Sequence, residues 1–408
     1  MKNKNTIIEA KIGNLNELTK VLSVKEQAQE QLLVVMKALG IGKIVRNLKF
    51  EKVQGYTLTS LFISLLIMRL WGKTIACATS NHFHGLCAVS KNTLYRALLN
   101  ARIDWRMLLT KITLRFHAIF RGHQVNTDEH DTCAILDDTT FQKSGIRIEG
   151  VSKVFGHVTH NFINGMKCLT PALSDGKSCY PIDFSLHREK GKKKDYGLTL
   201  KQRKEQFKEK RNAKNPDYAR KAECDESKLE MARRMLCHAV GHGINFKYVL
   251  ADSWFTCESL IQAVRELCGG SVHYIGLVKM NPKLRYQTSK SKRPQNIHEQ
   301  IVRYERTTSC YCRKYKCKYI QLHAKPGEQP IRIFIIKYGR STHWKVLLTT
   351  DTSMNFVRAF ELYERRWGIE VIFKECRGYL GLGKCQSRSY NAQIADTTLC
   401  FMMYQMLS

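Results

Sequence analysis

Two apolar segments that each end in aspartate constrain this chain more than any other feature. Residues 132–137 and 246–252 are nearly unbroken hydrophobic runs, and they close on Asp137 and Asp252. Hydrophobicity that is continuous rather than alternating is typical of a strand buried on both faces of a sheet. We therefore expect an α/β fold in which both aspartates lie where strands end.

Between these two strands, the pattern predicts a meander of hairpins followed by a crossover helix. Turn signals stand at Asn164-Gly165 and Asp175-Gly176, and a helical pattern covers residues 225–239. The segments predicted to be strands are 150–157, 165–174 and 179–186. Three hairpin strands, a helix and one more strand make a mixed α/β sheet, and ligands of such sheets gather where strands end.

The stretch after Asp252 is rich in strand signals. A helix is expected at 257–267, followed by strand-like runs at 272–278, 317–323, 331–338 and 345–350. We interpret residues 257–354 as a β-rich insertion. Residues 355–377 then predict one long helix, because aromatic residues recur there at helical spacing.

The first third of the chain is predicted to be helical. Apolar residues at helical spacing predict helices at 25–39 and 57–71, and Ser90 is a candidate N-cap for a helix at 91–100. In a helix-turn-helix arrangement, the exposed face of this last helix could contact DNA through Lys91, Asn92, Tyr95 and Arg96. An ordinary helical bundle with a solvated basic face fits the pattern equally well. We predict an all-α, DNA-binding domain over residues 1–125.

The charge of the chain indicates its partner. There are 67 Lys and Arg against 35 Asp and Glu, a formal net charge of +32, and such a field attracts polyanions, above all double-stranded DNA. A membrane surface is the alternative, but the most apolar stretch, 58–71, is shorter than the roughly 20 residues of a bilayer span and contains Arg69. The N-terminus lacks an apolar segment followed by a cleavage site, so we expect a cytoplasmic protein and no membrane association.

The fifteen cysteines are scattered through apolar segments, so we expect core residues rather than disulfides. One cluster has an alternative interpretation, because Cys310, Cys312 and Cys317, followed by His323, could supply four zinc ligands. Their C-x-C-x4-C spacing differs from that of common zinc knuckles. Alternation along a strand would place Cys310 and Cys312 on one face, and we favour this second interpretation.

The two aspartates at strand ends indicate a function more strongly together than either does alone. Taken alone, such an aspartate is usually a turn former or a helix N-cap. In a strongly basic chain that also has Glu370 on its late helix, metal binding is favoured, because phosphoryl transfer on DNA needs hard cations and these take oxygen ligands. Two ions about 3.5 to 4 Å apart would activate the attacking oxygen and stabilise the leaving one. We expect Asp137, Asp252 and Glu370 to be catalytic and to hold two Mg²⁺ or Mn²⁺ ions.

Three segments resemble one protein family. Residues 363–370, YERRWGIE, resemble the YREK signature, Y-x2-R-x3-E-x6-K, of IS-four type DDE transposases from bacterial insertion sequences. LDDTTFQKSG at 136–145 and LADSWF at 250–255 resemble the aspartate motifs of the same family. The signature positions fall on Tyr363, Arg366, Glu370 and Arg377, the last standing where the family has Lys. Because the first Asp of the family's DDT is catalytic, the resemblance selects Asp137 over Asp138.

The resemblance implies a fold and an activity. It implies a ribonuclease H-like catalytic domain, residues 126–256 and 355–408, interrupted by the insertion. The activity would be cleavage of DNA at transposon ends and strand transfer into a target, by a homodimer assembled on two ends near the bacterial nucleoid. An inactive DNA-binding descendant and a non-transposing nuclease of the same fold are the alternatives.

DNA contacts are expected at the signature and in a basic run. By resemblance, Tyr363, Arg366 and Arg377 contact DNA phosphates, and Trp367 either stacks on an unpaired base or packs in the core. Residues 188–221 hold fourteen Lys or Arg and five Asp or Glu. Such a run is usually a solvated loop, but its place before the crossover helix favours phosphate contact, through Lys192, Lys193 and Lys194 among others.

Overall fold

The structure is a computed structural model, and it describes residues 27–48, 56–79, 89–123, 131–156, 160–191, 193–288, 293–325, 329–339 and 341–408. Among these residues, twelve strands form a single sheet whose main path runs β2-β3-β1-β6-β7-β12-β11-β10-β8. The fold is therefore mixed α/β, as the alternation of strand and helix signals predicts.

The half of the sheet that begins with β1 confirms the predicted antiparallel strands, the turn at Asp175-Gly176 and the crossover helix. The turn predicted at Asn164-Gly165 is wrong, because both residues lie inside β3 and pair with β2. Its strands are β1 (Cys133–Gln142), β2 (Ser152–Gly156), β3 (Asn161–Ser174), β4 (Cys179–Pro181), β5 (Ser185–His187), β6 (Tyr248–Ala251) and β7 (His273–Leu277). β1, β2, β4 and β5 all pair antiparallel with β3, whereas β6 lies between β1 and β7 and pairs parallel with both. Helices make the crossovers, α9 (Lys228–Gly241) before β6 and α10 (Glu258–Glu266) before β7.

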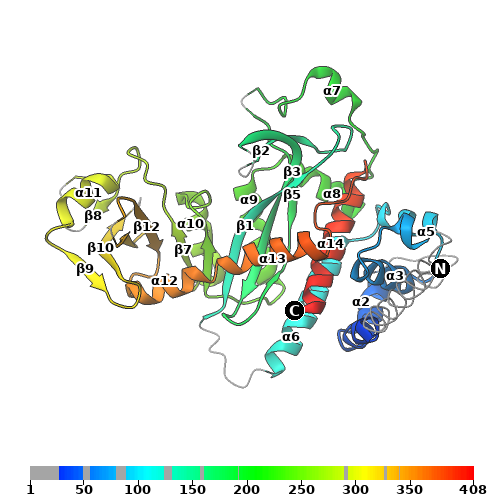
Figure 1. The fold of residues 1–408 in the computed structure, drawn as a ribbon, viewed down its shortest axis with the longest axis horizontal. Coiled ribbons are helices and arrows are strands. Elements are labelled where there is room, and N and C mark those ends of the chain that lie inside the picture. Colours follow the sequence, from blue (N-terminus) through cyan, green and yellow to red (C-terminus); the bar gives the residue numbers. More distant parts are fainter. Residues whose placement is uncertain are drawn as a thin grey trace, which may run out of the picture.

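The second half of the sheet extends from β7. Its strands are β8 (Gln287–Thr288), β9 (Ser309–Cys312), β10 (Cys317–Lys325), β11 (Ile331–Tyr338) and β12 (Trp344–Thr349), with α11 (Ile297–Tyr304) packed beside them. These strands pair antiparallel, and β12 joins them to β7. They form the lobe at the left of Figure 1, on the far side of β1 from the helices α2, α3 and α5.

In the described residues before 131, every regular element is a helix. Residues 27–38 are helical, and α2 (Ile41–Arg46), α3 (Leu58–Leu70), α4 (Ile75–Ala78), α5 (Lys91–Leu98) and α6 (Trp105–His123) follow. The hydroxyl of Ser90 accepts from the Thr93 N–H, which confirms the predicted N-cap. α5 buries Leu94, Ala97 and Leu98, leaving Lys91, Asn92, Tyr95 and Arg96 exposed. The turn-rich stretch 80–88 lies outside the described residues.

The helix predicted over 355–377 is divided into α12 (Phe356–Glu364) and α13 (Trp367–Tyr379). At the junction, backbone N–H groups donate to the carbonyl three residues earlier instead of four. These hydrogen bonds run from Arg365 to Leu362, from Arg366 to Tyr363 and from Ile369 to Arg366. This is a tight 3₁₀ turn, which keeps the axis nearly continuous (Figure 1). The aromatic periodicity could not reveal it, because both helix types place apolar residues three positions apart.

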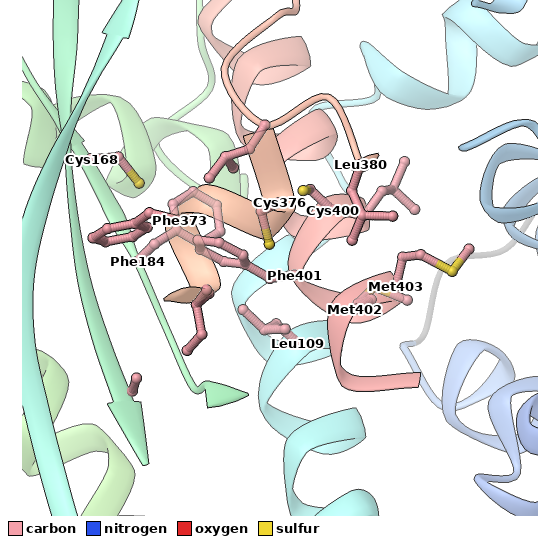
Figure 2. Packing of buried hydrophobic residues seen from close by; sticks show 14 of the residues in the cluster. Leu109, Cys168, Phe184, Phe373, Cys376, Leu380, Cys400, Phe401, Met402 and Met403 are labelled. Carbon is pink, nitrogen blue, oxygen red and sulfur yellow. The ribbon is translucent and has the colours of Figure 1, made fainter. Parts of the chain in front are cut away.

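Two hydrophobic clusters cover the two faces of the sheet. One contains side chains of α9 and α10. The other contains α13 and α14 (Tyr390–Leu407), together with the N-terminal helices. Figure 2 shows its centre, where Phe373, Phe401 and Phe184 meet, and the Phe184 and Phe401 rings lie edge to face at 5.6 Å. Nearly all of α14 is buried, so this helix ties the N-terminal helices to the sheet.

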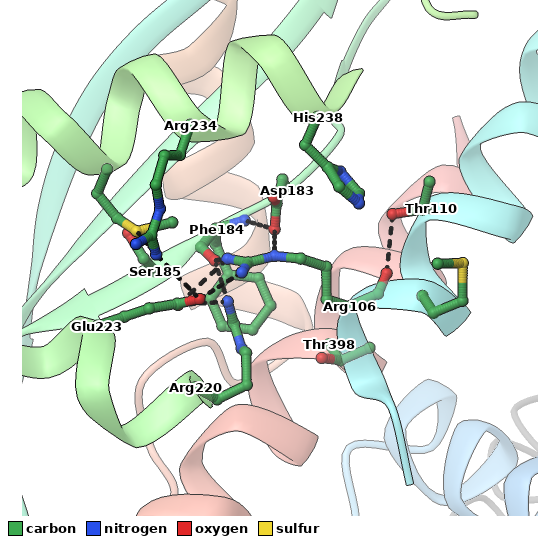
Figure 3. A network of polar contacts seen from close by, with 12 residues as sticks. Arg106, Thr110, Asp183, Phe184, Ser185, Arg220, Glu223, Arg234, His238 and Thr398 are labelled. Atoms are coloured by element: carbon green, nitrogen blue, oxygen red, sulfur yellow. Dashed lines mark hydrogen bonds and ion pairs between the residues drawn. The ribbon is translucent and has the colours of Figure 1, made fainter. Parts of the chain in front are cut away.

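A buried ion-pair network also anchors α6 (Figure 3). Arg106 of α6 pairs with Asp183 at 2.9 Å and with Glu223, and it donates to the Phe184 carbonyl at 3.0 Å. Arg220 reaches the same Glu223 at 2.7 Å. Because Asp183 is almost fully buried and Arg106 is its partner in this network, loss of Arg106 would leave an uncompensated charge.

Candidate active site

The pairing of β1 with β6 brings the first two predicted carboxylates side by side. Leu136 lies opposite Ala251 in the parallel ladder, so Asp137 and Asp252 take the next matched position on strands about 4.8 Å apart. Ile135 and Leu250, two residues earlier on each strand, pack into the cluster that contains α13 and α14. Since side chains alternate along a strand, Asp137 faces α13. Asp252 follows the last residue of β6 and lies close enough to Asp137 to interact with it electrostatically.

Glu370 reaches this pair through Arg366. The Arg366 guanidinium donates from Nη1 to Asp137 Oδ2 at 3.1 Å and from Nη2 to Glu370 Oε1. Asp252 is held differently, because its Oδ1 accepts from the backbone N–H of Trp254 at 2.9 Å and of Phe255 at 3.3 Å. The structure thus brings Asp137, Asp252 and Glu370 to one edge of the sheet, with an arginine bridging two of them. The bridge was missed in the sequence, although the spacing of four between Arg366 and Glu370 is a signal for it.

Asp138 points the other way. Its carboxylate pairs with Lys228 of α9 at 2.5 Å and lies 3.9 Å from Lys167. Leu136, on the same side of β1, belongs to the cluster that contains α9. Asp138 therefore lies on the sheet face opposite α13 and already has cationic partners.

Burial dominates the electrostatics of Asp137. Burial raises the pKa of its carboxyl to about 7, the charge of Arg366 and the Asp138 N–H oppose this rise, and the charges of Asp252 and Asp138 add to it. The positive charge of Arg366 therefore does not fully offset the burial of Asp137 and the negative charge of Asp252.

The donor set fits a hard divalent cation. Carboxylate oxygens on rigid strands and a helix are the ligands that Mg²⁺ and Mn²⁺ prefer, and such a cation would supply the charge that Asp137 lacks. In the arrangement described, no three Asp, Glu, His or Cys side chains of the described residues are gathered closely enough to hold a metal ion. Asp137 and Glu370 instead share the Arg366 guanidinium.

A cavity of about 470 Å³ adjoins the site between α12, α13 and the second half of the sheet. Tyr363 and Arg366 line it, and burial raises the pKa of the Tyr363 hydroxyl to about 12. Trp367, also in its wall, is 63% exposed, so this side chain is not part of the core. Arg377 lies two turns beyond Glu370 on α13 and donates to Thr139 Oγ1 and, at 2.8 Å, to the Thr140 carbonyl.

The basic run 188–221 has two kinds of cation. Its lysines are mostly exposed, Lys193 and Lys194 among them, whereas Lys192 lies outside the described residues. Its arginines are largely structural, since Arg211 pairs with Glu149 at 2.5 Å and with Asp217 at 3.3 Å, and Arg188 pairs with Asp225 at 2.5 Å. The sequence carries no signal for these pairs, because Glu149 is far from Arg211 along the chain.

The cysteine cluster lies on a hairpin of β9 and β10. Cys312 stands opposite Cys317, and Cys310 stands opposite Tyr319. This register puts Cys310, Cys312 and Cys317 on one face of the hairpin. Cys312 and Cys317 are buried there, whereas Cys310 is exposed.

Comparison with known protein families is consistent with this geometry. A model described as DDE superfamily endonuclease matches residues 73–302, which include Asp137 and Asp252, and a model described as transposase DDE domain matches residues 220–406, which include Asp252 and Glu370. No curated protein matches the chain. Among the described helices, none has the length and apolar character needed to cross a bilayer. The second match covers most of the residues that the first leaves out. Because the first match covers more than half of the sequence, the chain belongs to the DDE superfamily of endonucleases.

Proposed function

We propose that this protein is a DNA transposase of the IS-four type, with a YREK signature formed by Tyr363, Arg366, Glu370 and Arg377. The observation that carries the proposal is the bridge from Arg366 to Asp137 and Glu370, which sets the signature helix against the first aspartate motif. The reaction begins with attack of water on a phosphodiester at a transposon end. A bond from water oxygen to phosphorus forms, the bond to the 3′ oxygen breaks, and the freed 3′ hydroxyl then attacks a phosphodiester of the target.

DDE endonucleases generally use divalent metal ions, and we assign Asp137, Asp252 and Glu370 as ligands of two Mg²⁺ or Mn²⁺ ions. Bound there, the ions would lower the pKa of the attacking hydroxyl and stabilise the leaving oxygen. The protein's own part is positional. The parallel pairing of β1 and β6 sets the spacing of the aspartates, and Asp252 is oriented by the two N–H groups that follow it.

The DNA is held by cations around this edge. Arg366 exchanges its carboxylate partners for a phosphate, and Tyr363 and Arg377 contact the strand beside it. Trp367 is exposed and stacks on an unpaired base, a use that suits a ring with a free face. Lys192, Lys193 and Lys194 contribute affinity without sequence information, because they bind phosphates.

The domain organisation follows from the same proposal. Residues 1–125 form a helical DNA-binding domain that presents the exposed face of α5. Residues 126–256 and 355–408 form a ribonuclease H-like catalytic domain, which the antiparallel β1–β3 pairing and the parallel β1–β6 pairing support. Residues 257–354 form the β-rich insertion. The working assembly is a homodimer on two DNA ends, in the cytoplasm beside the nucleoid.

An assay with purified protein, Mg²⁺ and DNA carrying the element's ends tests the proposal. Cleavage at the ends followed by joining of the 3′ hydroxyls to a target plasmid is expected. Cleavage with no joining would favour a non-transposing nuclease. Binding with neither reaction would favour an inactive DNA-binding descendant.

A further inference from the structure

A second cavity, of about 540 Å³, lies beyond the carboxylates along β1. It opens where the end of β1 meets the segment between α13 and α14. Its wall contains three cationic side chains, several hydroxyl or amide groups and no carboxylate, namely Thr140, Phe141, Gln142, Lys143, Ser144, Arg377, Leu382, Gly383, Lys384 and Gln386. A concave surface with this composition concentrates positive potential.

The first cation, Lys143, is buried with neutral partners only. Its ammonium donates to the carbonyls of Gly383 and Cys385 at 2.9 and 2.7 Å, and to Gln393 Oε1 at 2.7 Å. Burial lowers the pKa of Lys143 to about 8. The Lys143 ammonium therefore holds the segment between α13 and α14 in place and adds positive potential to the cavity.

The other two cations also lack counter-charges. Arg377 uses Nη2 for Thr139 and Thr140, and burial lowers the pKa of its guanidinium. Lys384 is exposed at the rim. Within the described residues, neither they nor Lys143 form an ion pair with a carboxylate, although most arginines near the sheet do. An uncompensated group of this kind favours an anionic ligand.

The cavity wall is held against β1. Gly383 has φ +78°, and a Cβ there would lie 2.9 Å from the Phe141 ring, so only glycine permits this approach. Ser144 donates from its backbone N–H and its hydroxyl to Gln386 Oε1, at 3.2 and 3.0 Å. The concavity is thus a built feature of the DNA-free fold.

Its distance from the carboxylates suits a bound strand. Thr140 is three residues beyond Asp137 on β1, about 10 Å. Arg377 is seven residues beyond Glu370 on α13, again about 10 Å. Both elements therefore lead from the acidic site to the cationic one, over a distance of a few nucleotides along a DNA strand.

We propose that this cavity binds a backbone phosphate of the DNA strand that passes through the acidic site, with Lys384 and Arg377 as its direct contacts and Lys143 as a fixed source of potential. The inference rests on the proposed function. It adds a binding site for a phosphodiester a few nucleotides from the bond that is cut.

Two variants at the exposed rim test the site. Lys384→Gln removes a charge, Gln386→Glu introduces the opposite one, and Lys374→Gln removes an exposed lysine of α13 that does not line the cavity. Binding of the full chain to a labelled duplex carrying the element's end is measured by fluorescence anisotropy over a range of salt. Melting temperatures confirm that each variant folds.

Lys384→Gln should weaken binding several-fold and lower the slope of log K against log salt by about 0.9, the effect of removing one cation from a phosphate. Gln386→Glu should weaken binding further, and Lys374→Gln should match the wild type. Wild-type binding by Lys384→Gln and Gln386→Glu, or an equal loss in all three variants, would overturn the site. Failure of the proposed function is distinguishable, since it would appear as cleavage that survives Glu370→Gln while these binding effects persist.

Discussion

The Arg366 guanidinium donates to the Asp137 carboxylate at 3.1 Å, which joins the start of α13 to β1. The same guanidinium contacts Glu370, so one cation occupies the space between two carboxylates that are expected to share metal ions. In the structure, Arg366 offsets only part of the negative charge at this site. We expect that a DNA phosphate competing for the guanidinium would make the two carboxylates available to cations.

This competition can be measured directly. Arg366→Gln removes the bridging charge and should tighten Mn²⁺ binding to the DNA-free protein about tenfold, equivalent to about 1.4 kcal/mol. Isothermal titration calorimetry provides the measurement. The control is Arg365→Gln, because Arg365 bonds the Asp131 carbonyl instead. Weaker Mn²⁺ binding by Arg366→Gln would mean that the arginine positions the carboxylates instead of competing for them.

Glu370→Gln should separate chemistry from binding. The change removes a ligand charge but little shape, so strand cleavage should fall on the order of 1000-fold while affinity for end DNA stays near that of the wild type. Glu375→Gln, an exposed glutamate of the same helix, serves as the control and should cleave normally. Gel assays of cleavage and binding, run in parallel, give both quantities. A parallel loss of both activities in Glu370→Gln would indicate a structural role.

The two adjacent aspartates should differ in function. Asp137→Asn should abolish cleavage, whereas Asp138→Asn should retain it and lose about 1–3 kcal/mol of unfolding free energy, because Lys228 and Lys167 would lose their charged partner. Urea denaturation and a cleavage assay on the same preparations check this. Loss of cleavage in a stably folded Asp138→Asn protein would reassign the metal ligand.

The basic run should divide into DNA-binding lysines and structural arginines. Replacing Lys193, Lys194 and Lys201 with Gln should weaken binding to all DNA sequences alike and flatten the salt dependence, since each lysine removed from a phosphate lowers the slope by about 0.9. An unchanged slope would indicate solvated lysines, and a sequence-selective loss would indicate that the run reads bases.

Arg211→Gln is the matched structural variant. It leaves Glu149 and Asp217 buried without their cation, so it should cost about 3–5 kcal/mol of stability. The binding affinity of the folded fraction should be unchanged. Thermal unfolding and anisotropy measurements separate the two effects, and a normal melting temperature would contradict the role of the network.

Much of this fold follows from local pattern. The unbroken apolar runs before Asp137 and Asp252 predict buried strands, because only a strand covered on both faces tolerates continuous hydrophobicity. Asn164-Gly165 does not form the expected turn, because it lies inside β3. Turn residues at Asp175-Gly176 do mark the turn between β3 and β4, and Ser90 marks a helix start. These signals lie within a few residues of the elements they specify, so one sequence is sufficient to find them.

Long-range pairing decided the rest. The register of β1 with β6, in which Leu136 lies opposite Ala251, brings Asp137 and Asp252 together. The packing of α9 against the other face of the sheet allows Lys228 to form an ion pair with Asp138. The ion pair of Arg211 with Glu149 and the hydrogen bonds of Lys143 to Gly383 and Gln393 likewise join residues distant in the chain. The sequence by itself determined which charged residues stand at the ends of strands. Only the tertiary structure decided which charges meet, because burial and ion pairing depend on distances that local pattern does not encode.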